Sequence, residues 1–302
     1  MAGDRSSYLV GTDWLNERLD DQSVRILDVT GMLTSELKNV ARDRVYDEGH
    51  IPGAVFFDIA SAKGALSDPD AKLPWTWPSK ARVEAAMAEH GVGNDTRVVL
   101  YAASPRLGVD FGPMWCTRAW WVMHHFGADC AVLNGGYEKW VAEGRPVSTE
   151  PVTPSLARFV ASSDGRHAIA TKDDVCAAQA EGGECVVDAL SAASYAGTDK
   201  MVYGPRKGHI AGAVSLPMYY MLSGKGLTFA DRDTLTARFA ECGLSADQLV
   251  ITYCGGGIAA TVDAFALKLI GNDRVRVYDG SLMEWSSDDS LPMTDPSAAD
   301  DG

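Results

Sequence analysis

Residues 49–59 read GHIPGAVFFDI, and a closely related stretch, GHIAGAVSLPM, occupies residues 208–218. Three further pairs of blocks recur in the same order along the chain: RILDVT (25–30) with CVVDAL (185–190), RVVLYAAS (97–104) with QLVITYCG (248–255), and AVLNGGYEKW (131–140) with VRVYDGSLMEW (275–285). Four matched pairs in one order favour an internal duplication over two unrelated domains that share similar turns. The chain of 302 residues is long enough for two domains that each bury a core.

Each copy alternates short apolar runs with amphipathic segments. VRILDV (24–29) is typical of a buried strand, and SKARVEAAMAEHG (79–91) is typical of a helix. This alternation predicts an α/β fold in each copy, with an open, mostly parallel sheet flanked by helices. We expect a first domain over 1–147, a linker rich in proline, serine and threonine over 148–160, and a second domain over 161–302.

The composition excludes several classes of protein. A formal net charge of −14 argues against general affinity for nucleic acid or for anionic membranes. The chain has no run of about 18 apolar residues and no secretory signal pattern, so we expect a cytoplasmic protein without a membrane helix. Its six cysteines form no CxxC pair and its six histidines form no HExxH motif. We therefore expect no disulfide framework and no metal site.

The segment 254–259 joins a predicted strand to a predicted helix. Its residues are Cys254, Gly255, Gly256, Gly257, Ile258 and Ala259. Glycines let several N–H groups point inward, and with the helix dipole they form an anion site that would lower the pKa of the Cys254 thiol. The alternative is a buried cysteine beside an ordinary glycine turn. The first copy has Ala102 at the equivalent position, and this asymmetry favours a catalytic cysteine in the second copy only.

These blocks, together with YCGGGIAA (253–260), resemble the tandem-domain rhodaneses and 3-mercaptopyruvate sulfurtransferases. The resemblance extends from about Tyr8 to Trp285. It implies two rhodanese-like domains, of which the first is catalytically inactive, and a persulfide-forming Cys254 in the second. Asp188 resembles the family's structural aspartate, which organises loops near the site. A direct acid–base role for Asp188 is the alternative.

The resemblance also implies a reaction. The Cys254 thiolate would take the sulfane sulfur of an anionic donor such as thiosulfate or 3-mercaptopyruvate, and loop amides would hold the persulfide. Cyanide or a thiol, including thioredoxin or another thiol protein, would then accept the sulfur. Such covalent catalysis in two halves predicts ping-pong kinetics and needs no cofactor.

The sequence departs from the family pattern around this cysteine. The family's thiosulfate enzymes resemble CRKG here and its mercaptopyruvate enzymes resemble CGSG, whereas this loop reads CGGG, without a cation or a hydroxyl. Leu190 and Ser194 stand where the family has arginines that bind the donor. Arg206 and Lys207 could supply replacement charge. The alternative for these two residues is a solvated loop.

The first copy offers further candidates. Arg106 and Arg118 could also supply positive charge to the substrate. They belong to an expanded region around 103–117, which could cover the site or be a surface elaboration. His50 recurs as His209, which predicts a loop-bracing hydrogen bond in each copy, with a site role for His50 as the alternative.

Two other functions compete with the sulfurtransferase interpretation. A cysteine-dependent phosphatase or arsenate reductase needs a short loop that closes on an arginine, but no arginine follows Cys254 before Arg274. A non-enzymatic persulfide carrier or binding protein, which has lost donor turnover, is the stronger rival because the expected arginines are missing. Steady-state turnover would separate the enzyme from the carrier.

Overall fold

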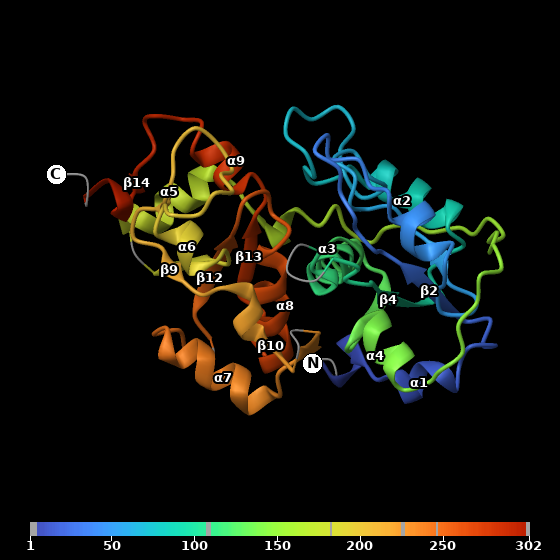
Figure 1. The fold of residues 1–302 in the computed structure, drawn as a ribbon. Helices are drawn as coiled ribbons and strands as arrows, with labels where there is room; N and C mark the ends of the chain where they lie inside the picture. The colour runs from blue at the N-terminus through green and yellow to red at the C-terminus, as the bar shows by residue number, and fades with distance from the viewer. Residues whose placement is uncertain (1–4, 107–109, 182, 225–226, 246, 300–302) are drawn as a thin grey trace. The chain divides into compact units, whose positions relative to one another are not determined.

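The computed structural model describes residues 5–106, 110–181, 183–224, 227–245 and 247–299. The chain divides into two compact units, Met1–Gly165 and Arg166–Gly302. Each unit is an α/β domain with a five-stranded sheet (Figure 1).

The first unit is built on a five-stranded parallel sheet in the order β1-β5-β4-β2-β3. The strands are β1 (Leu9–Val10), β2 (Val24–Asp28), β3 (Val55–Phe56), β4 (Arg97–Tyr101) and β5 (Asp129–Leu133). The helices are α1 (Thr12–Asn16), α2 (Lys80–Glu89), α3 (Gly112–His125) and α4 (Gly136–Ala142), with a 3₁₀ turn at Arg5–Tyr8 and a π-helical turn at Arg42–Tyr46.

The second unit repeats this plan with a parallel sheet in the order β6-β13-β12-β7-β9. The sheet strands are β6 (Ile169–Ala170), β7 (Glu184–Asp188), β9 (Val214–Ser215), β12 (Leu249–Tyr253) and β13 (Val275–Tyr278). Two antiparallel pairs flank it: β8 (His209–Ile210) with β14 (Met293–Thr294), and β10 (Leu222–Ser223) with β11 (Thr228–Phe229). The helices are α5 (Lys172–Glu181), α6 (Ala192–Tyr195), α7 (Arg232–Glu241), α8 (Ala260–Ile270) and α9 (Ser281–Trp285), with 3₁₀ turns at Arg166–Ala168, Met218–Met221 and Pro296–Ala299.

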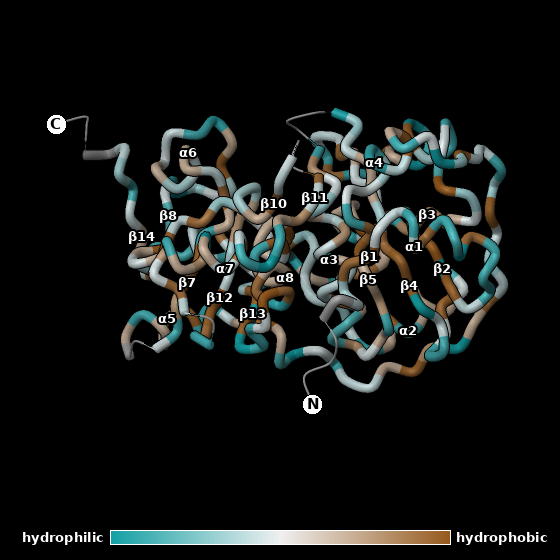
Figure 2. The backbone as a smooth tube through the Cα atoms, turned by 90° about the horizontal axis from the view of Figure 1, so that it is seen from below, coloured by the Kyte–Doolittle hydropathy of each residue, from teal (hydrophilic) through white to brown (hydrophobic). Residues whose placement is uncertain are grey.

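The matching strand orders confirm the predicted α/β fold of two similar domains. β4 and β12 lie at the centre of their sheets, and each is buried from its second residue onward. The tube in Figure 2 is most strongly apolar along such central strands. Burial on both faces explains why RVVLY and LVITY are continuous apolar runs rather than alternating ones.

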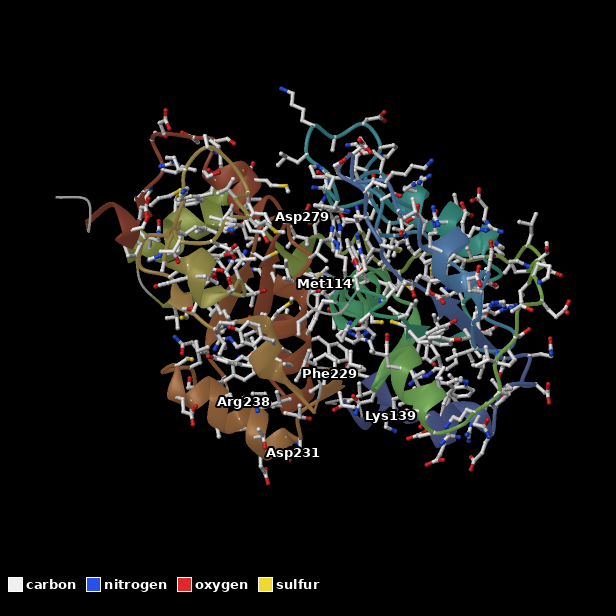
Figure 3. The ribbon with its side chains drawn as sticks, viewed as in Figure 1. Met114, Lys139, Phe229, Asp231, Arg238 and Asp279 are labelled. Atoms are coloured by element: carbon white, nitrogen blue, oxygen red, sulfur yellow. The ribbon has the colours of Figure 1, made fainter. Side chains whose placement is uncertain are left out.

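Local sequence sets the ends of the helices in the second unit. Asp231, labelled in Figure 3, begins α7 by accepting the N–H of Thr234 at 2.8 Å. Gly271 ends α8 in a left-handed conformation with φ 110°, which glycine adopts without steric cost. The helix predicted after the cysteine loop therefore ends at the predicted glycine.

The predicted linker, 148–160, follows the surface of the first unit. Ser148 forms an antiparallel bridge with His50. Val160 exchanges two hydrogen bonds with the side chain of Asn94, both of 2.9 Å. The domain boundaries drawn from the sequence stay a prediction.

No helix in the described part of the chain is long and apolar enough to cross a membrane. All six cysteines are free thiols, and no three histidine, cysteine, aspartate or glutamate side chains among the described residues gather as a metal site would require.

A buried tyrosine–aspartate pair recurs at the carboxyl end of each sheet. In the second unit the Tyr253 hydroxyl donates to Asp188 Oδ2 at 2.7 Å and accepts the N–H of Ile210 at 3.1 Å. In the first unit Tyr101 bonds Asp28 in the same way and accepts the N–H of Ile51 at 3.2 Å. Each pair ties the central strand to its neighbour and to the GHI block; we call it the tyrosine brace.

We predict that Tyr253→Phe and Tyr101→Phe destabilise their units by similar amounts. Each change leaves a buried carboxyl group and a buried N–H without this partner, which costs about 1–3 kcal/mol in the free energy of unfolding. Denaturant unfolding would measure the loss. Tyr195→Phe is a control, because its half-buried hydroxyl bonds a single carbonyl, that of Ala213. A loss below about 0.5 kcal/mol in both variants would contradict the structural role of the brace.

Candidate active site

The cysteine loop follows directly from the central strand of the second unit. Cys254 is the first residue after β12 and is 2% exposed. Its carbonyl accepts the N–H of Leu282 at 3.0 Å, and the carbonyl of Gly255 accepts the N–H of Met283 at 2.9 Å. Two amides at the start of α9 thus hold the loop at the carboxyl end of the sheet, where open α/β sheets bind their ligands.

Ser281 is a second anchor that the sequence analysis missed. Its hydroxyl accepts the N–H groups of Cys254 and Gly257, both at 3.1 Å, and donates to the carbonyl of Tyr278 at 2.7 Å. Ser281 is fully buried and has a φ of +48°, which a non-glycine residue rarely adopts. The aligned block of the first copy has Gly136 here, with φ +55°. In the sequence, only the alignment of Ser281 with Gly136 hinted at a special role for this position.

The glycines of the loop are required by close packing. A Cβ on Gly257, whose φ is +74°, would lie 2.8 Å from the carbonyl oxygen of Asp279, a residue labelled in Figure 3. A Cβ on Gly255 would lie 2.1 Å from Cδ1 of Tyr203. Glycine therefore permits the tight turn at one position and the approach of an aromatic ring at the other.

The electrostatics of Cys254 correct one expectation. Burial raises the pKa of its thiol, and backbone N–H groups of Ala260, Gly256 and Ile258 lower it by less. Asp188 adds a smaller upward contribution to this pKa. The predicted net lowering of the pKa was wrong, because desolvation outweighs the amides. The amides nevertheless act in the direction that an anion cradle requires, because they favour the thiolate.

Asp188 lies near the cysteine loop, and its hydrogen bonds hold the surrounding backbone and the Tyr253 side chain. It is fully buried, and it accepts the N–H of Leu190 at 2.9 Å in addition to the Tyr253 hydroxyl. Burial raises its pKa to about 6, and these two hydrogen bonds act in the opposite direction. A structural role for Asp188 agrees with this geometry, and its contribution to the site stays a prediction.

Arg206 is bound by backbone carbonyls of its own unit. Its guanidinium donates to the carbonyls of Ser286, Leu291, Trp285 and Asp288, at 2.5–3.0 Å. Four of its five N–H groups are thus used to fix the chain that follows α9. A contact of Arg206 or Lys207 with the donor stays a prediction. Lys207 is exposed and forms no ion pair with any described residue.

The paired histidines both brace loops. His50 Nδ1 bonds the carbonyl of Tyr46 at 2.9 Å, and its ring stacks on Tyr46 at 4.0 Å between centroids. His209 Nδ1 bonds the carbonyl of Tyr195 at 2.7 Å, with the same stacking at 3.6 Å. Because both copies share this contact, it agrees with the predicted bracing. A site role for His50 stays a prediction.

The two arginines predicted from the first copy are engaged within the first unit. Arg106 binds both carboxylate oxygens of Asp110, each at 2.7 Å. Arg118 is 2% exposed, donates to the carbonyl of Trp75 and lies over the ring of Trp77 at 5.7 Å. Substrate roles for both stay predictions. Positions 107–109 of the expanded region lie outside the described residues.

Asp263 is an unexpected feature of the helix that follows the loop. It is fully buried on α8, and neither of its carboxyl oxygens has a hydrogen-bond partner among the described residues. Burial raises the pKa of this carboxyl group well above its ordinary value, and Asp188 adds to the rise. Asp263 in turn contributes to the raised pKa of Cys242. Such a group costs stability.

Comparison with known proteins gives the family. Residues 11–143 and 171–288 both match the rhodanese-like domain, so the chain belongs to the rhodanese-like family. It is 34% identical over 292 residues to the 3-mercaptopyruvate sulfurtransferase of Escherichia coli, covering 95% of this chain and 98% of the relative. It is also 34% identical to the thiosulfate sulfurtransferase of Cricetulus griseus, covering 92% and 91%.

Other similarities extend the comparison. The sulfur carrier protein TtuD of Thermus thermophilus is 31% identical, covering 94% of this chain and 95% of the relative. The crystal structure of SseA from Escherichia coli, described as a 3-mercaptopyruvate sulfotransferase of rhodanese fold, matches with a TM-score of 0.76 and 32% identity, over 91% of this chain and 98% of that one. Together these similarities confirm the tandem fold and the predicted enzyme class, a sulfurtransferase.

We predict that Ser281→Gly lowers kcat/KM for sulfur transfer about tenfold while the protein stays folded. Glycine tolerates the positive φ but removes the acceptor of two loop amides, and a tenfold loss corresponds to about 1.4 kcal/mol. Steady-state assays would measure the change. Ser287→Gly is the matched control, because Ser287 is an exposed serine just after α9. Equal activity of both variants would contradict the anchoring role.

We predict that Asp263→Val raises the melting temperature by about 2–8 °C, because it removes a buried carboxyl group without partners. Folding raises the pKa of Asp263, so the native state binds its proton more tightly than the unfolded state does. Asp263 therefore costs the native state least below about pH 4, where it is neutral in both states, and the free energy of unfolding falls as the pH rises above that value. The gain from the substitution should be larger at pH 8 than at pH 5, as calorimetry would measure.

Asp263→Asn separates charge from polarity in this experiment. It removes the ionisable group but keeps a polar side chain, so it should remove the contribution of Asp263 to the pH dependence and recover only part of the stability. If the valine variant melts below the wild type at both pH values, Asp263 has a stabilising partner and the interpretation is wrong.

Proposed function

We propose that this sulfurtransferase works through a persulfide on Cys254. The observation that supports the proposal is the position of Cys254, the first residue after the central strand β12, in a loop whose backbone N–H groups at Gly256, Ile258 and Ala260 favour its thiolate. The same strand position in the first unit holds Ala102, whose carbonyl accepts an N–H from Tyr137 as that of Cys254 does from Leu282. Both copies therefore have this backbone hydrogen bond, but only the second has a thiol at the position that it holds.

The reaction has two balanced steps. In the first, the Cys254 thiolate attacks the sulfane sulfur of the donor, a new S–S bond forms, and the donor's bond to that sulfur breaks. The bonding electron pair leaves with sulfite, when thiosulfate is the donor, or with the enolate of pyruvate, which takes up a proton, when 3-mercaptopyruvate is the donor. In the second step an acceptor takes the terminal sulfur and regenerates the thiolate.

The loop favours a donor with little negative charge. Positions 255–257 carry no side chains, and Leu190 and Ser194 carry no positive charge. A dianion such as thiosulfate would lose its hydration here without a compensating cation. A monoanion such as 3-mercaptopyruvate loses less, so we infer that it is the better donor of the two.

Several kinds of acceptor could take the sulfur from the Cys254 persulfide. Cyanide or a small thiol can attack the persulfide sulfur, and thioredoxin or another thiol protein is a further candidate. A persulfide sulfur held by amides rather than by cations keeps its charge stabilised while remaining open to a nucleophile.

A persulfide carrier is the second candidate function. The burial that raises the pKa of Cys254 lowers the fraction of reactive thiolate, which would slow donor turnover. One relative, from Thermus thermophilus, is named a sulfur carrier protein. A carrier would accept one sulfur per chain and pass it to a partner, with no steady-state turnover on small donors.

We predict that donor treatment adds about 32 Da, one sulfur atom, to the peptide that contains Cys254. Cys254→Ser should abolish this adduct and reduce turnover to background, because a serine hydroxyl cannot form a persulfide. Mass spectrometry and an assay with each donor would measure both effects. Cys242→Ser is the matched control, since Cys242 is a half-buried thiol at the end of α7.

The outcomes are distinct. An adduct on Cys242 or Cys116 instead of Cys254 would overturn the assignment of the site. An adduct on Cys254 without steady-state turnover on either donor would favour the carrier over the enzyme.

A further inference from the structure

The ring of Tyr203 lies directly on the cysteine loop of the second unit. Tyr203 belongs to the segment between α6 and β8, and a Cβ added to Gly255 would lie 2.1 Å from its Cδ1 and 2.2 Å from its Cε1. Gly255 is the residue next to Cys254, and its carbonyl is held by the N–H of Met283 at 2.9 Å. The ring therefore occupies the space that a side chain at position 255 would fill.

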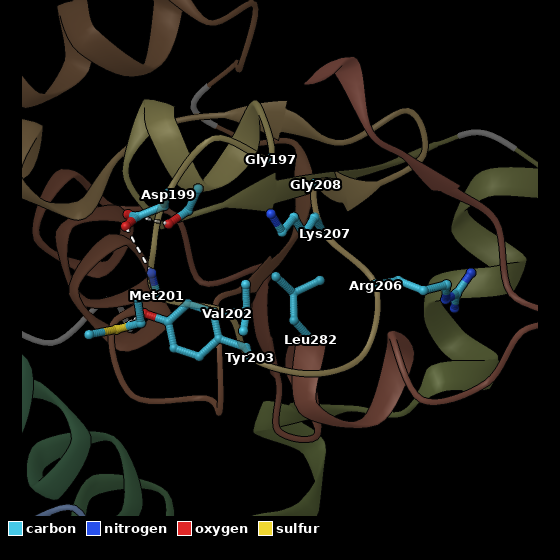
Figure 4. A pocket seen from close by; sticks show the side chains of 10 residues that line it. Gly197, Asp199, Met201, Val202, Tyr203, Arg206, Lys207, Gly208 and Leu282 are labelled. Carbon is cyan, nitrogen blue, oxygen red and sulfur yellow. Dashed lines mark hydrogen bonds between the residues drawn. The ribbon is translucent and has the colours of Figure 1, made fainter. Parts of the chain in front are cut away.

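The hydroxyl group of Tyr203 has only a weak hydrogen-bond partner. It donates to Sδ of Met201 at 3.2 Å, and it has no other hydrogen-bond partner among the described residues. A thioether sulfur is a weak acceptor. Met201 is itself 62% exposed, and Figure 4 shows the hydroxyl end of the Tyr203 ring beside it. A stronger acceptor that arrives from solvent can therefore take this hydrogen bond from the thioether.

The surroundings of Tyr203 keep its hydroxyl group protonated. Burial raises the pKa of this phenol, and the charges of Cys254, Asp199 and Asp188 raise it further. Because a thiolate at Cys254 disfavours a phenolate nearby, Tyr203 stays neutral when the thiolate forms. The contribution of Cys254 also agrees with the contact between the ring and Gly255. Tyr203 can therefore donate a hydrogen bond to an anion next to the loop.

Three other polar side chains of this region already have stronger partners. The Ser194 hydroxyl donates to Asp199 at 2.9 Å, and the Arg206 guanidinium donates to four backbone carbonyls. The Ser281 hydroxyl donates its hydrogen to the carbonyl of Tyr278 at 2.7 Å. The phenol that packs on the loop is therefore a side-chain donor that a substrate can still bind.

We propose that Tyr203 determines donor specificity, and that its hydroxyl group donates a hydrogen bond to the carboxylate of the sulfur donor in place of Met201. The contact between its ring and Gly255 sets the position of this hydroxyl relative to Cys254. A hydrogen bond from a neutral phenol suits a monocarboxylate such as 3-mercaptopyruvate better than a dianion, which loses more hydration. This inference rests on the proposed persulfide at Cys254 and names a donor-binding residue of the same site.

The test measures loading and discharge of Cys254 separately. Single-turnover loading of the full-length protein is followed by mass spectrometry of the Cys254 adduct, with 3-mercaptopyruvate or inorganic polysulfide as the donor. Polysulfide also gives a sulfane sulfur to the thiolate and leaves as a chain one sulfur atom shorter, but it has no carboxylate. Discharge of the loaded protein is measured with cyanide.

Tyr203→Phe keeps the ring and removes the hydroxyl group. We expect it to slow loading from subsaturating 3-mercaptopyruvate about tenfold, because one charge-assisted hydrogen bond to the donor is lost. Loading from polysulfide and discharge by cyanide should stay close to the wild-type rates, because neither reagent has a carboxylate. Tyr220→Phe is the matched control and should change none of the three rates, since Tyr220 is an exposed tyrosine of the 3₁₀ turn Met218–Met221.

A second set of variants tests the contact between the ring and the loop. Gly255→Ala places a Cβ where the Tyr203 ring lies, so it should displace the ring and slow loading from 3-mercaptopyruvate. In a Tyr203→Ala background the ring is absent, and Gly255→Ala should then slow loading little further. Such non-additivity measures the coupling between the two positions.

Other outcomes overturn the proposal in distinguishable ways. If Cys254 of the wild type acquires no sulfur from either donor, the proposed function itself fails. If the wild type loads but Tyr203→Phe loads from 3-mercaptopyruvate equally fast, the hydroxyl does not bind the donor and the inference is wrong. Equal slowing with both donors would show a structural role of Tyr203 in the loop and would also overturn it. Full additivity of the Gly255 and Tyr203 variants would contradict positioning through the ring.

Discussion

The hydrogen bond between the Tyr253 hydroxyl and Asp188 is the contact on which the second unit's site depends. It joins the central strand β12 to β7, and the same hydroxyl accepts the N–H of Ile210 from the second GHI block. Cys254 is the next residue along the chain, so the brace fixes where the loop begins. Because donor, acceptor and N–H are all buried, an alternative position of the strand would leave polar groups without partners. The first unit has the same brace but no thiol, which indicates that the brace stabilises the fold whether or not a catalytic cysteine follows it.

Burial and anion binding oppose each other at Cys254. Removing the thiol from water favours its neutral form, while three backbone N–H groups favour the thiolate. Burial is the larger effect here, and the neighbouring Asp188 reinforces it. A site of this kind gains little from holding a free thiolate, and more from amides that stabilise charge as it develops on sulfur during transfer. The neutral CGGG loop therefore suits an enzyme that recognises its substrates away from the reacting sulfur.

The sequence predicted the architecture well because the duplicated blocks are the parts that form the sheets. QLVITY and RVVLY are continuous apolar runs, and both became central parallel strands. The loop, its neighbouring helix and the terminating Gly271 were also predicted. The sequence could not predict which groups that are far apart along the chain contact one another in the folded protein. Arg206 is bound to carbonyls about 80 residues away, and the dominant desolvation of Cys254 depends on neighbours that no local pattern reveals. Ser281 was hard to recognise because a serine at the start of a short helix looks like an ordinary cap.

The comparison of the two units shows how few changes separate scaffold from site. Both keep the brace, the central strand and the amide that supports the residue after it. The second unit has Cys254 in place of Ala102 and Ser281 in place of Gly136, and the serine supplies an acceptor to the cysteine loop at a backbone conformation that glycine would adopt more easily. Holding a serine there costs backbone strain, which persists only where the surroundings over-determine it. The strain is therefore best understood as the cost of fixing the loop amides around the sulfur, a requirement that the first unit, without a thiol, does not have.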